Sequence, residues 1–276
     1  KASFTQGTAI FSPDPRVPVD TVVGFSSRGP ALNQAQNQLI DVIKPDVTAP
    51  GIHVLAGASP EHVSEANGEL DLYGAQSQLF QVIQGTSMSS PHVAGVGALL
   101  KALHPNWTPS QIRSALMTTA LNNGQKARDP DGDHAADPFD LGAGRIDMAR
   151  APLAGFTLDE SAANFEAADP TNDGDPTQLN LASITDANCV ASCTWVRTIK
   201  STLDTTVDWA VSASLPPTLT VLVTPTNFSL AAGASQVVTI TADVSNAGYN
   251  KWAYGTILFT PNSTRTVEAH FPLAVQ

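Results

Sequence analysis

The spacing of the apolar residues changes near residue 150, and this change constrains the fold more than any other feature. Before it, helical spacing alternates with short β-rich runs; after it come alternating apolar and polar residues with frequent turn residues. At 276 residues the chain is long enough for one large domain or two ordinary ones. We therefore expect an α/β unit over residues 1–154, then an acidic connector and an all-β unit over residues 155–276.

The strongest helical pattern runs from Ser87 to Leu103. Val93, Val96 and Leu100 repeat at helical spacing up to Leu103. The small residues beside this stripe are Ala94, Gly95, Gly97 and Ala98. A stripe of small residues lets a helix pack very close to a sheet, so we expect this helix to lie against one.

A second helix is predicted to begin at Thr108. Thr108-Pro-Ser-Gln111 forms a capping box with proline at the first helical position. We expect Asn122-Asn-Gly124 to end it. The short strands expected in the same unit are Thr21–Phe25, Ile52–Ala56 and Leu79–Ile83.

The second unit has the pattern of a β-sandwich. Its predicted strands are Thr194–Lys200, Thr206–Ser212, Leu219–Thr224, Gln236–Val244, Gly255–Pro261 and Arg265–Leu273. Short strands at this spacing over roughly 100 residues are typical of immunoglobulin-like or fibronectin-like folds. We expect Trp195, Trp209 and Trp252 to fill its core. The Asp/Pro-rich stretch Phe156–Thr177 predicts an extended connector.

The segment Gly85-Thr-Ser-Met-Ser-Ser-Pro-His-Val-Ala-Gly95 carries the chemistry of the chain. Its serine, Ser87, stands where a helix begins, among unpaired backbone N–H groups and the positive end of the helix dipole. Such N–H groups can stabilise the oxyanion that forms when a hydroxyl attacks a carbonyl. On position alone, however, a plain helix N-cap is the favoured interpretation of Ser87.

The same segment, Gly85 to Gly95, closely resembles the nucleophile motif of the subtilisin-like serine proteases (subtilases). The resemblance extends to Phe25-Ser-Ser-Arg-Gly-Pro30 and to Lys44-Pro-Asp-Val-Thr-Ala-Pro-Gly51, which look like two family segments upstream of the nucleophile. The first is typical of subtilases with an inserted protease-associated domain. Asp137-Pro-Phe-Asp-Leu-Gly-Ala-Gly-Arg-Ile146 resembles the stretch that closes their catalytic domain, and the β-rich tail is similar to the fibronectin-like domain that follows it.

The resemblance implies a fold and a set of roles. Residues 1–154 are expected to be the C-terminal portion of a subtilisin-like, three-layer α/β domain with a parallel sheet, followed by the sandwich. Ser87 is the expected catalytic nucleophile, and its backbone N–H, assisted by Thr86, is expected to supply part of the oxyanion hole. Met88 is expected to form a wall on the leaving-group side.

The sequence departs from the family in one respect. The Asp-Thr-Gly segment, the His-Gly-Thr-His segment and the oxyanion Asn of the family all precede the serine, and none occurs here. In the family, the histidine at the position of His92 is buried and hydrogen-bonded, and we expect the same of His92. The other histidines, which have no motif context, are His53, His62, His104, His134 and His270. Since the sequence also begins without Met, we expect a piece of a longer protein that is inactive alone.

We expect no cofactor and no metal. One alternative stays open, because Asp129, Asp131 and Asp133 alternate and acids continue at Asp137 and Asp140, which resembles a calcium loop. His134 occupies the position where such a loop needs glycine, so a plain acidic loop is the favoured interpretation.

Charge and cysteines indicate the compartment and the partners. Residues 121–186 hold 13 acids against 4 bases, within a net charge of −11, which argues against nucleic acid. Cys189 and Cys193, without zinc-ligand partners nearby, favour a small disulfide loop in an oxidising compartment, although two free thiols remain an alternative. An oxidising compartment and the resemblance imply a secreted protein, and no apolar run approaches the roughly 18 residues of a membrane span.

The sequence thus predicts part of a secreted subtilisin-like endopeptidase that acts on polypeptides and works with the upstream part of the same protein. Two alternatives are a catalytically degenerate subtilase and a non-catalytic β-sandwich binding module.

Overall fold

The computed structural model describes residues 20–33, 37–58 and 79–276. Its α-helices are α1 (Thr86–Leu103), α2 (Pro109–Thr118), α3 (Pro138–Leu141) and α4 (Ala162–Ala167). The strands of the first unit are β1 (Thr21–Val22), β2 (Ala31–Asn33), β3 (Gln38–Ile40), β4 (Val54–Gly57), β5 (Phe80–Ile83), β6 (Lys126–Asp129) and β7 (Gly132–Ala135). Those of the second are β8 (Phe156–Thr157), β9 (Ile184–Asp186), β10 (Ser192–Ser201), β11 (Val207–Ser214), β12 (Thr220–Thr224), β13 (Asn227–Leu230), β14 (Ser235–Asp243), β15 (Ala253–Pro261) and β16 (Ala269–Val275).

The second unit is a β-sandwich, as predicted. One sheet has the order β12-β14-β10-β8 and the other β13-β11-β15-β16-β9. All pairs are antiparallel except β16 with β9. Trp195 and Trp209 are buried between the sheets, whereas Trp252 is only half-buried and lies outside this core, so its predicted place is wrong.

The first unit confirms the α/β prediction only in part. β1 pairs with β6 in parallel, and a further parallel bridge joins Thr48 to Arg145. The other strand pairs in the described part of this unit are the antiparallel hairpins β2–β3, β4–β5 and β6–β7, and an antiparallel bridge joins Leu121 to Arg145. The last of these hairpins forms where the sequence predicted a plain acidic loop.

Both predicted helices are present, and α2 ends earlier than expected. Thr108 accepts from the N–H of Gln111, whose side chain in turn accepts from the N–H of Thr108, which confirms the capping box. The helix ends at Thr118 rather than at Asn122 because the chain then leaves to pair with Arg145. The two N–H···O bonds between Leu121 and Arg145 measure 2.8 and 2.9 Å.

The predicted extended connector, Phe156–Thr177, is wrong. Phe156 and Leu158 are each 1% exposed in the sandwich core, and β8 pairs with β10. Ser161 caps α4, while the side chains of Asp169 and Asp175 cap short 3₁₀ turns. The Asp-Pro pairs, which the sequence analysis interpreted as part of a linker, therefore begin folded turns.

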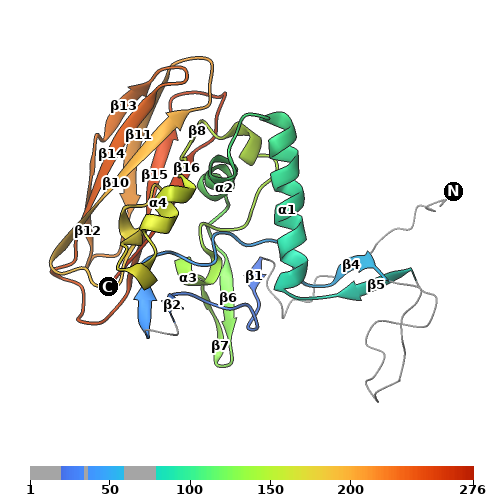
Figure 1. The fold of residues 1–276 in the computed structure, drawn as a ribbon. Helices are drawn as coiled ribbons and strands as arrows, with labels where there is room; N and C mark the ends of the chain where they lie inside the picture. The colour runs from blue at the N-terminus through green and yellow to red at the C-terminus, as the bar shows by residue number, and fades with distance from the viewer. Residues whose placement is uncertain (1–19, 34–36, 59–78) are drawn as a thin grey trace.

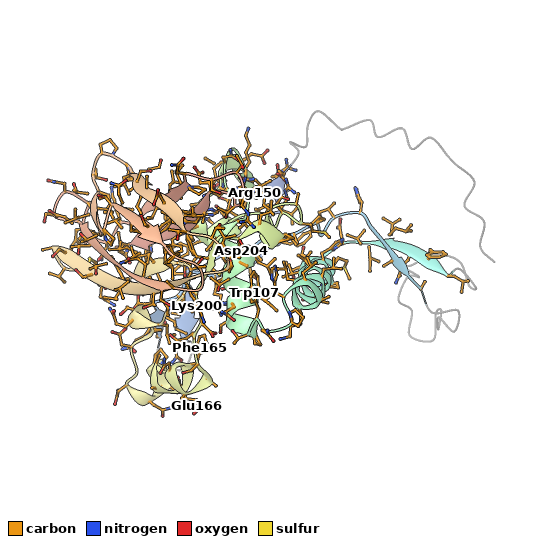
Figure 2. The ribbon with its side chains drawn as sticks, turned by 90° about the horizontal axis from the view of Figure 1, so that it is seen from above. Trp107, Arg150, Phe165, Glu166, Lys200 and Asp204 are labelled. Atoms are coloured by element: carbon orange, nitrogen blue, oxygen red, sulfur yellow. A yellow bond between two sulfur atoms is a disulfide. The ribbon has the colours of Figure 1, made fainter. Side chains whose placement is uncertain are left out.

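The two units pack against each other through α2 and the stretch after α3. Met117, Ala120 and Ala143 belong to the same buried cluster as the sandwich core. In Figures 1 and 2, α1 lies on the side of α2 away from the sandwich, and hairpin β4–β5 projects away from the body. Within the described residues no helix is long and apolar enough to cross a membrane.

Candidate active site

Ser87 lies in the first turn of α1. Gly85 is the N-cap and makes no side-chain cap bond, so Ser87 is the second helical residue and the N-cap interpretation is wrong. Gly85 has φ +152°, a conformation that favours glycine. The side chains of Thr86 and Ser87 are both exposed. Because no helical turn precedes them, the N–H groups of Thr86 and Ser87 have no intrahelical acceptor.

The 44–51 segment holds this first turn in place. The N–H of Gly85 donates to the carbonyl of Gly51 at 2.8 Å, and Ser89 Oγ donates to the carbonyl of Ala49 at 2.9 Å. A Cβ on Gly51 would lie 2.8 Å from the carbonyl oxygen of Gly85, which is closer than real Cβ contacts come. Glycine at this position therefore permits the close approach of the two segments.

A cavity of about 450 Å³ joins three of the family-like segments. It is lined by Phe25 and Ser26 from one segment, by Ala49 from the second, and by Thr86 and Ser89 of α1; Ser87 itself is not among the lining residues. The fold thus gathers residues that are more than 60 positions apart in sequence around the start of α1.

Met88 is half-buried and folds back over Gly85. Its N–H donates to the carbonyl of Gly85 at 3.0 Å, and its sulfur lies 3.6 Å from the position that a Cβ on Gly85 would take. This position is compatible with the predicted wall on the leaving-group side, and that role stays a prediction.

No histidine of the described part hydrogen-bonds to Ser87. His92, predicted to be buried, is exposed, although its Nδ1 does lie 2.7 Å from the carbonyl oxygen of Met88. It is exposed because the described residues do not cover that face of α1. The ring of His104 stacks on Trp107 at 3.9 Å, and His270 lies 2.7 Å from the carbonyl of Ala143. His62 lies outside the described residues.

The Asp137–Ile146 stretch forms a charged cluster with Arg28. Arg28 donates to Asp137 at 2.8 Å and pairs with Asp140, whose side chain is 1% exposed. Burial alone would lower the pKa of Arg28, but the carboxylates of Asp140, Asp137 and Asp129 raise it above its ordinary value. Asp137 and Asp140 also form the capping box of α3.

Four of the five acids of the calcium alternative, Asp129, Asp133, Asp137 and Asp140, contact protein partners. Asp133 accepts from Arg128 at 2.7 and 3.2 Å across hairpin β6–β7, while His134 lies 3.3 Å from Asp129 and 3.1 Å from Asp140. Within the described ranges no group of three or more His, Cys, Asp or Glu side chains could hold a metal ion. The expectation that no cofactor is needed stays a prediction.

Phe139 on α3 lies at the junction with the sandwich, which the sequence did not reveal. Its ring meets Trp252 and Tyr254 of the β15 region edge-on, with centroids 4.8 and 5.7 Å apart. Burial, together with the nearby carboxylate of Asp137, raises the pKa of Tyr254 to about 12. The aromatic residues Trp252 and Tyr254 were the sequence signal for this junction. Their spacing does not decide whether they face the sandwich core or a neighbouring unit.

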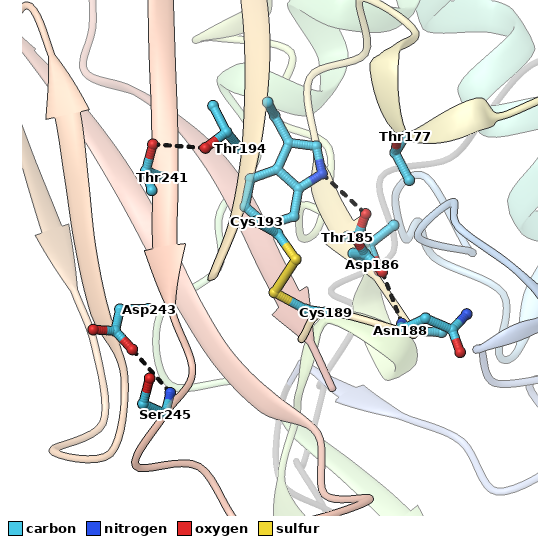
Figure 3. The surroundings of a disulfide bond; sticks show 12 residues. Thr177, Thr185, Asp186, Asn188, Cys189, Cys193, Thr194, Thr241, Asp243 and Ser245 are labelled. Carbon is cyan, nitrogen blue, oxygen red and sulfur yellow. Dashed lines mark hydrogen bonds between the residues drawn. A yellow bond between two sulfur atoms is a disulfide. The ribbon is translucent and has the colours of Figure 1, made fainter. Parts of the chain in front are cut away.

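Cys189 and Cys193 form a disulfide with their Cα atoms 5.6 Å apart (Figure 3). Beside it the N–H of Asn188 donates to Asp186 at 2.7 Å, and the indole of Trp195 donates to the carbonyl of Thr185 at 3.2 Å. The bridge therefore closes the loop that leads from β9 into β10.

Two family models match the sequence, and they agree with this architecture. The first describes the subtilase family and covers residues 16–144; the second describes a fibronectin type-III domain and covers residues 178–275. Residues 16–144 thus match the subtilase family. The subtilase segment contains Ser87, the 44–51 segment and most of the Asp137–Ile146 stretch, and the fibronectin domain contains β9 to β16.

Named relatives of the chain are plant subtilisin-like proteases. The chain is 39% identical to subtilisin-like protease SBT3 of Solanum lycopersicum, over 54% of this chain and 19% of the relative. It is 41% identical to SBT1.4 of Arabidopsis thaliana over 60% of this chain and 20% of the relative. With SBT3.13 of Arabidopsis thaliana it shares 31% identity over 83% of this chain and 32% of the relative. The chain thus spans a fifth to a third of the length of these relatives.

Solved structures resemble the chain only weakly. The secreted serine protease VesC from Vibrio cholerae matches 39% of this chain and 25% of that chain, with 14% identity and a TM-score of 0.29. A likeness at this level carries no argument about function.

Proposed function

We propose that the chain is part of a subtilisin-like serine endopeptidase in which Ser87 is the nucleophile. The observation that carries this proposal is that Ser87 is exposed in the first turn of α1. The helix begins after Gly85, whose φ of +152° favours glycine. The subtilase match across the same residues supports it. Polypeptides are the proposed substrates.

The proposed reaction is acyl transfer. Ser87 Oγ attacks the scissile carbonyl carbon as its proton passes to a histidine, and the tetrahedral intermediate collapses with departure of the amine, which takes up that proton. Water then hydrolyses the acyl-enzyme and restores Ser87. In this proposal the N–H of Ser87, assisted by Thr86, donates to the oxyanion, because these N–H groups stand at the positive end of the dipole of α1.

The histidine, its aspartate and the oxyanion asparagine are proposed to come from an upstream part of the same protein. The outward face of α1 supports this, because Ala94, Gly95 and Ala98, expected to pack on a sheet, are exposed, and Leu99 and Leu103 are 52% and 61% exposed. On hairpin β4–β5, Phe80 is 61% exposed. Surfaces of this kind in one region mark a contact site. We propose that the upstream part covers them.

The proposal includes secretion and an inserted protease-associated domain. The disulfide between Cys189 and Cys193 supports an oxidising compartment. The form of the Phe25–Pro30 segment supports the branch with the inserted domain.

Peptide hydrolysis by the full-length protein tests the proposal. We expect Ser87→Ala to lower kcat by roughly 10⁴-fold or more, while Ser212→Ala, an exposed serine on β11, retains kcat within a factor of about three. Full activity in Ser87→Ala contradicts the assigned nucleophile. A folded wild-type protein without activity favours the degenerate subtilase instead.

A further inference from the structure

The loop that lines the cavity at the start of α1 is held by Phe139. Phe25 and Ser26 line that cavity, and the chain continues from them to Gly29. The N–H of Gly29 donates to the carbonyl of Phe139 at 3.0 Å. A Cβ on Gly29 would lie 2.6 Å from Cδ1 of the Phe139 ring, so the ring lies directly against the loop backbone. We call residues 24–30 the cavity loop.

The ring of Phe139 is in turn held by the fibronectin domain. Phe139 is 2% exposed, and Trp252 meets it edge-on, with centroids 4.8 Å apart and planes at 89°. Tyr254 meets it from 5.7 Å at 88°. Edge-to-face pairs have a preferred geometry, so two of them fix the position of the ring more closely than burial alone would.

Charged groups link the same three parts. Arg28 of the cavity loop pairs with Asp137 and Asp140, which flank Phe139 on α3. The phenol of Tyr254 lies near Asp137. The cavity loop, α3 and β15 therefore form one packed unit.

We propose that Trp252 is a positioning residue of the protease site. It holds Phe139, Phe139 holds the cavity loop, and the loop lines the cavity at the start of α1, next to Thr86, where we place the polypeptide substrate. Trp252 does not touch the reacting atoms; it acts on substrate binding through Phe139. The expected effect of Trp252 on substrate binding rests on the proposed function. Its effect on the position of the cavity loop is the structural half of the proposal, and it is tested without catalysis.

Amide hydrogen exchange on the 276-residue chain tests the structural half. In Trp252→Ala we expect the amide of Gly29 to exchange about 10-fold faster or more, while the amides of Val238 and Ile240 in the sandwich core keep their rates. Tyr249→Ala, which removes a side chain that is 93% exposed, is the matched control and leaves Gly29 unchanged. An exchange rate at Gly29 within about two-fold of wild type in Trp252→Ala overturns the proposal.

Kinetics of the full-length protein test the other half. We expect Trp252→Ala to raise KM about five-fold, with kcat and the rate of Ser87 labelling by a small organophosphonate within about two-fold of wild type. Trp252→Phe, which retains an edge-on ring, restores KM. A KM that is unchanged in folded Trp252→Ala overturns the positioning role; if that variant does not fold, Trp252→Leu is compared with Trp252→Phe in the same way. Inactive wild-type protein would count against the proposed function alone, because the exchange of Gly29 is read independently.

Discussion

Ser89 of α1 donates its hydroxyl to the carbonyl oxygen of Ala49 over 2.9 Å, and this bond ties the helix that carries Ser87 to the 44–51 segment. A backbone bond from Gly85 to Gly51 lies beside it at 2.8 Å. Together these two bonds hold the first turn of α1 against the 44–51 segment, and both segments line the cavity.

Replacing Ser89 should weaken this attachment. The bond is partly buried, so Ser89→Ala is expected to lower the free energy of unfolding by about 1 kcal/mol. Urea denaturation of the 276-residue chain measures the change, with Ser90→Ala, an exposed neighbour, expected within about 0.5 kcal/mol of wild type. Equal effects of the two substitutions would contradict the assigned role of Ser89.

Asp41 should make the chain less stable as the pH rises. Burial, with the charges of Asp186 and Asp175, raises the pKa of Asp41 to about 6 from an ordinary value of 3.8. The folded state therefore retains a proton that the unfolded state releases, so stability falls between about pH 4 and pH 6 and is constant above.

Asp41→Asn removes this charge and keeps the oxygen that accepts the N–H of Ala187 at 2.6 Å. We expect the variant to be more stable than wild type by about 1 kcal/mol at pH 7, after allowance for solvent screening, and equal to it near pH 3.5. Thermal unfolding across this range measures both. A constant difference at all pH values would show that the charge of Asp41 is not the cause.

Arg197 should be a main stabilising residue of the fibronectin domain. It is 2% exposed and donates to four backbone carbonyls at 2.9 to 3.1 Å, those of Leu181, Val196, Thr177 and Ser183. Arg197→Met leaves these carbonyls without their donor, and we expect a loss of about 2–4 kcal/mol in guanidinium denaturation. Lys200→Met, an exposed residue on the same strand, is the control; a similar loss there would point to a general effect of lost charge.

Local signals in the sequence predicted local structure well. The capping box at Thr108 needs only four consecutive residues, and the helix at Ser87 needs only its own periodicity. By contrast, Asp-Pro pairs occur both in linkers and at the start of 3₁₀ turns. What decides between these is the burial of Phe156 and Leu158 by distant strands, and the sequence does not show that packing.

In the candidate site, too, the sequence predicted local features and did not predict those that depend on distant packing. The motif around Ser87 predicted a helix start with free N–H groups, and the structure has one. The exposure of His92 was not predictable, because it depends on which segments cover α1 and not on the residues of α1. Trp252 was misplaced for the same reason: it lies just before β15, outside the predicted strand Gly255–Pro261, and the unit that it faces is set by tertiary packing.

The most direct test of the account is to map fluorophosphonate labelling on the full-length protein and on the 276-residue chain, with the labelled peptide identified by mass spectrometry. We expect a single label on Ser87 in the full-length protein, loss of that label in Ser87→Ala, and no labelling of the 276-residue chain alone. A label on another residue of the full-length protein, or efficient labelling of Ser87 in the isolated chain, would contradict it.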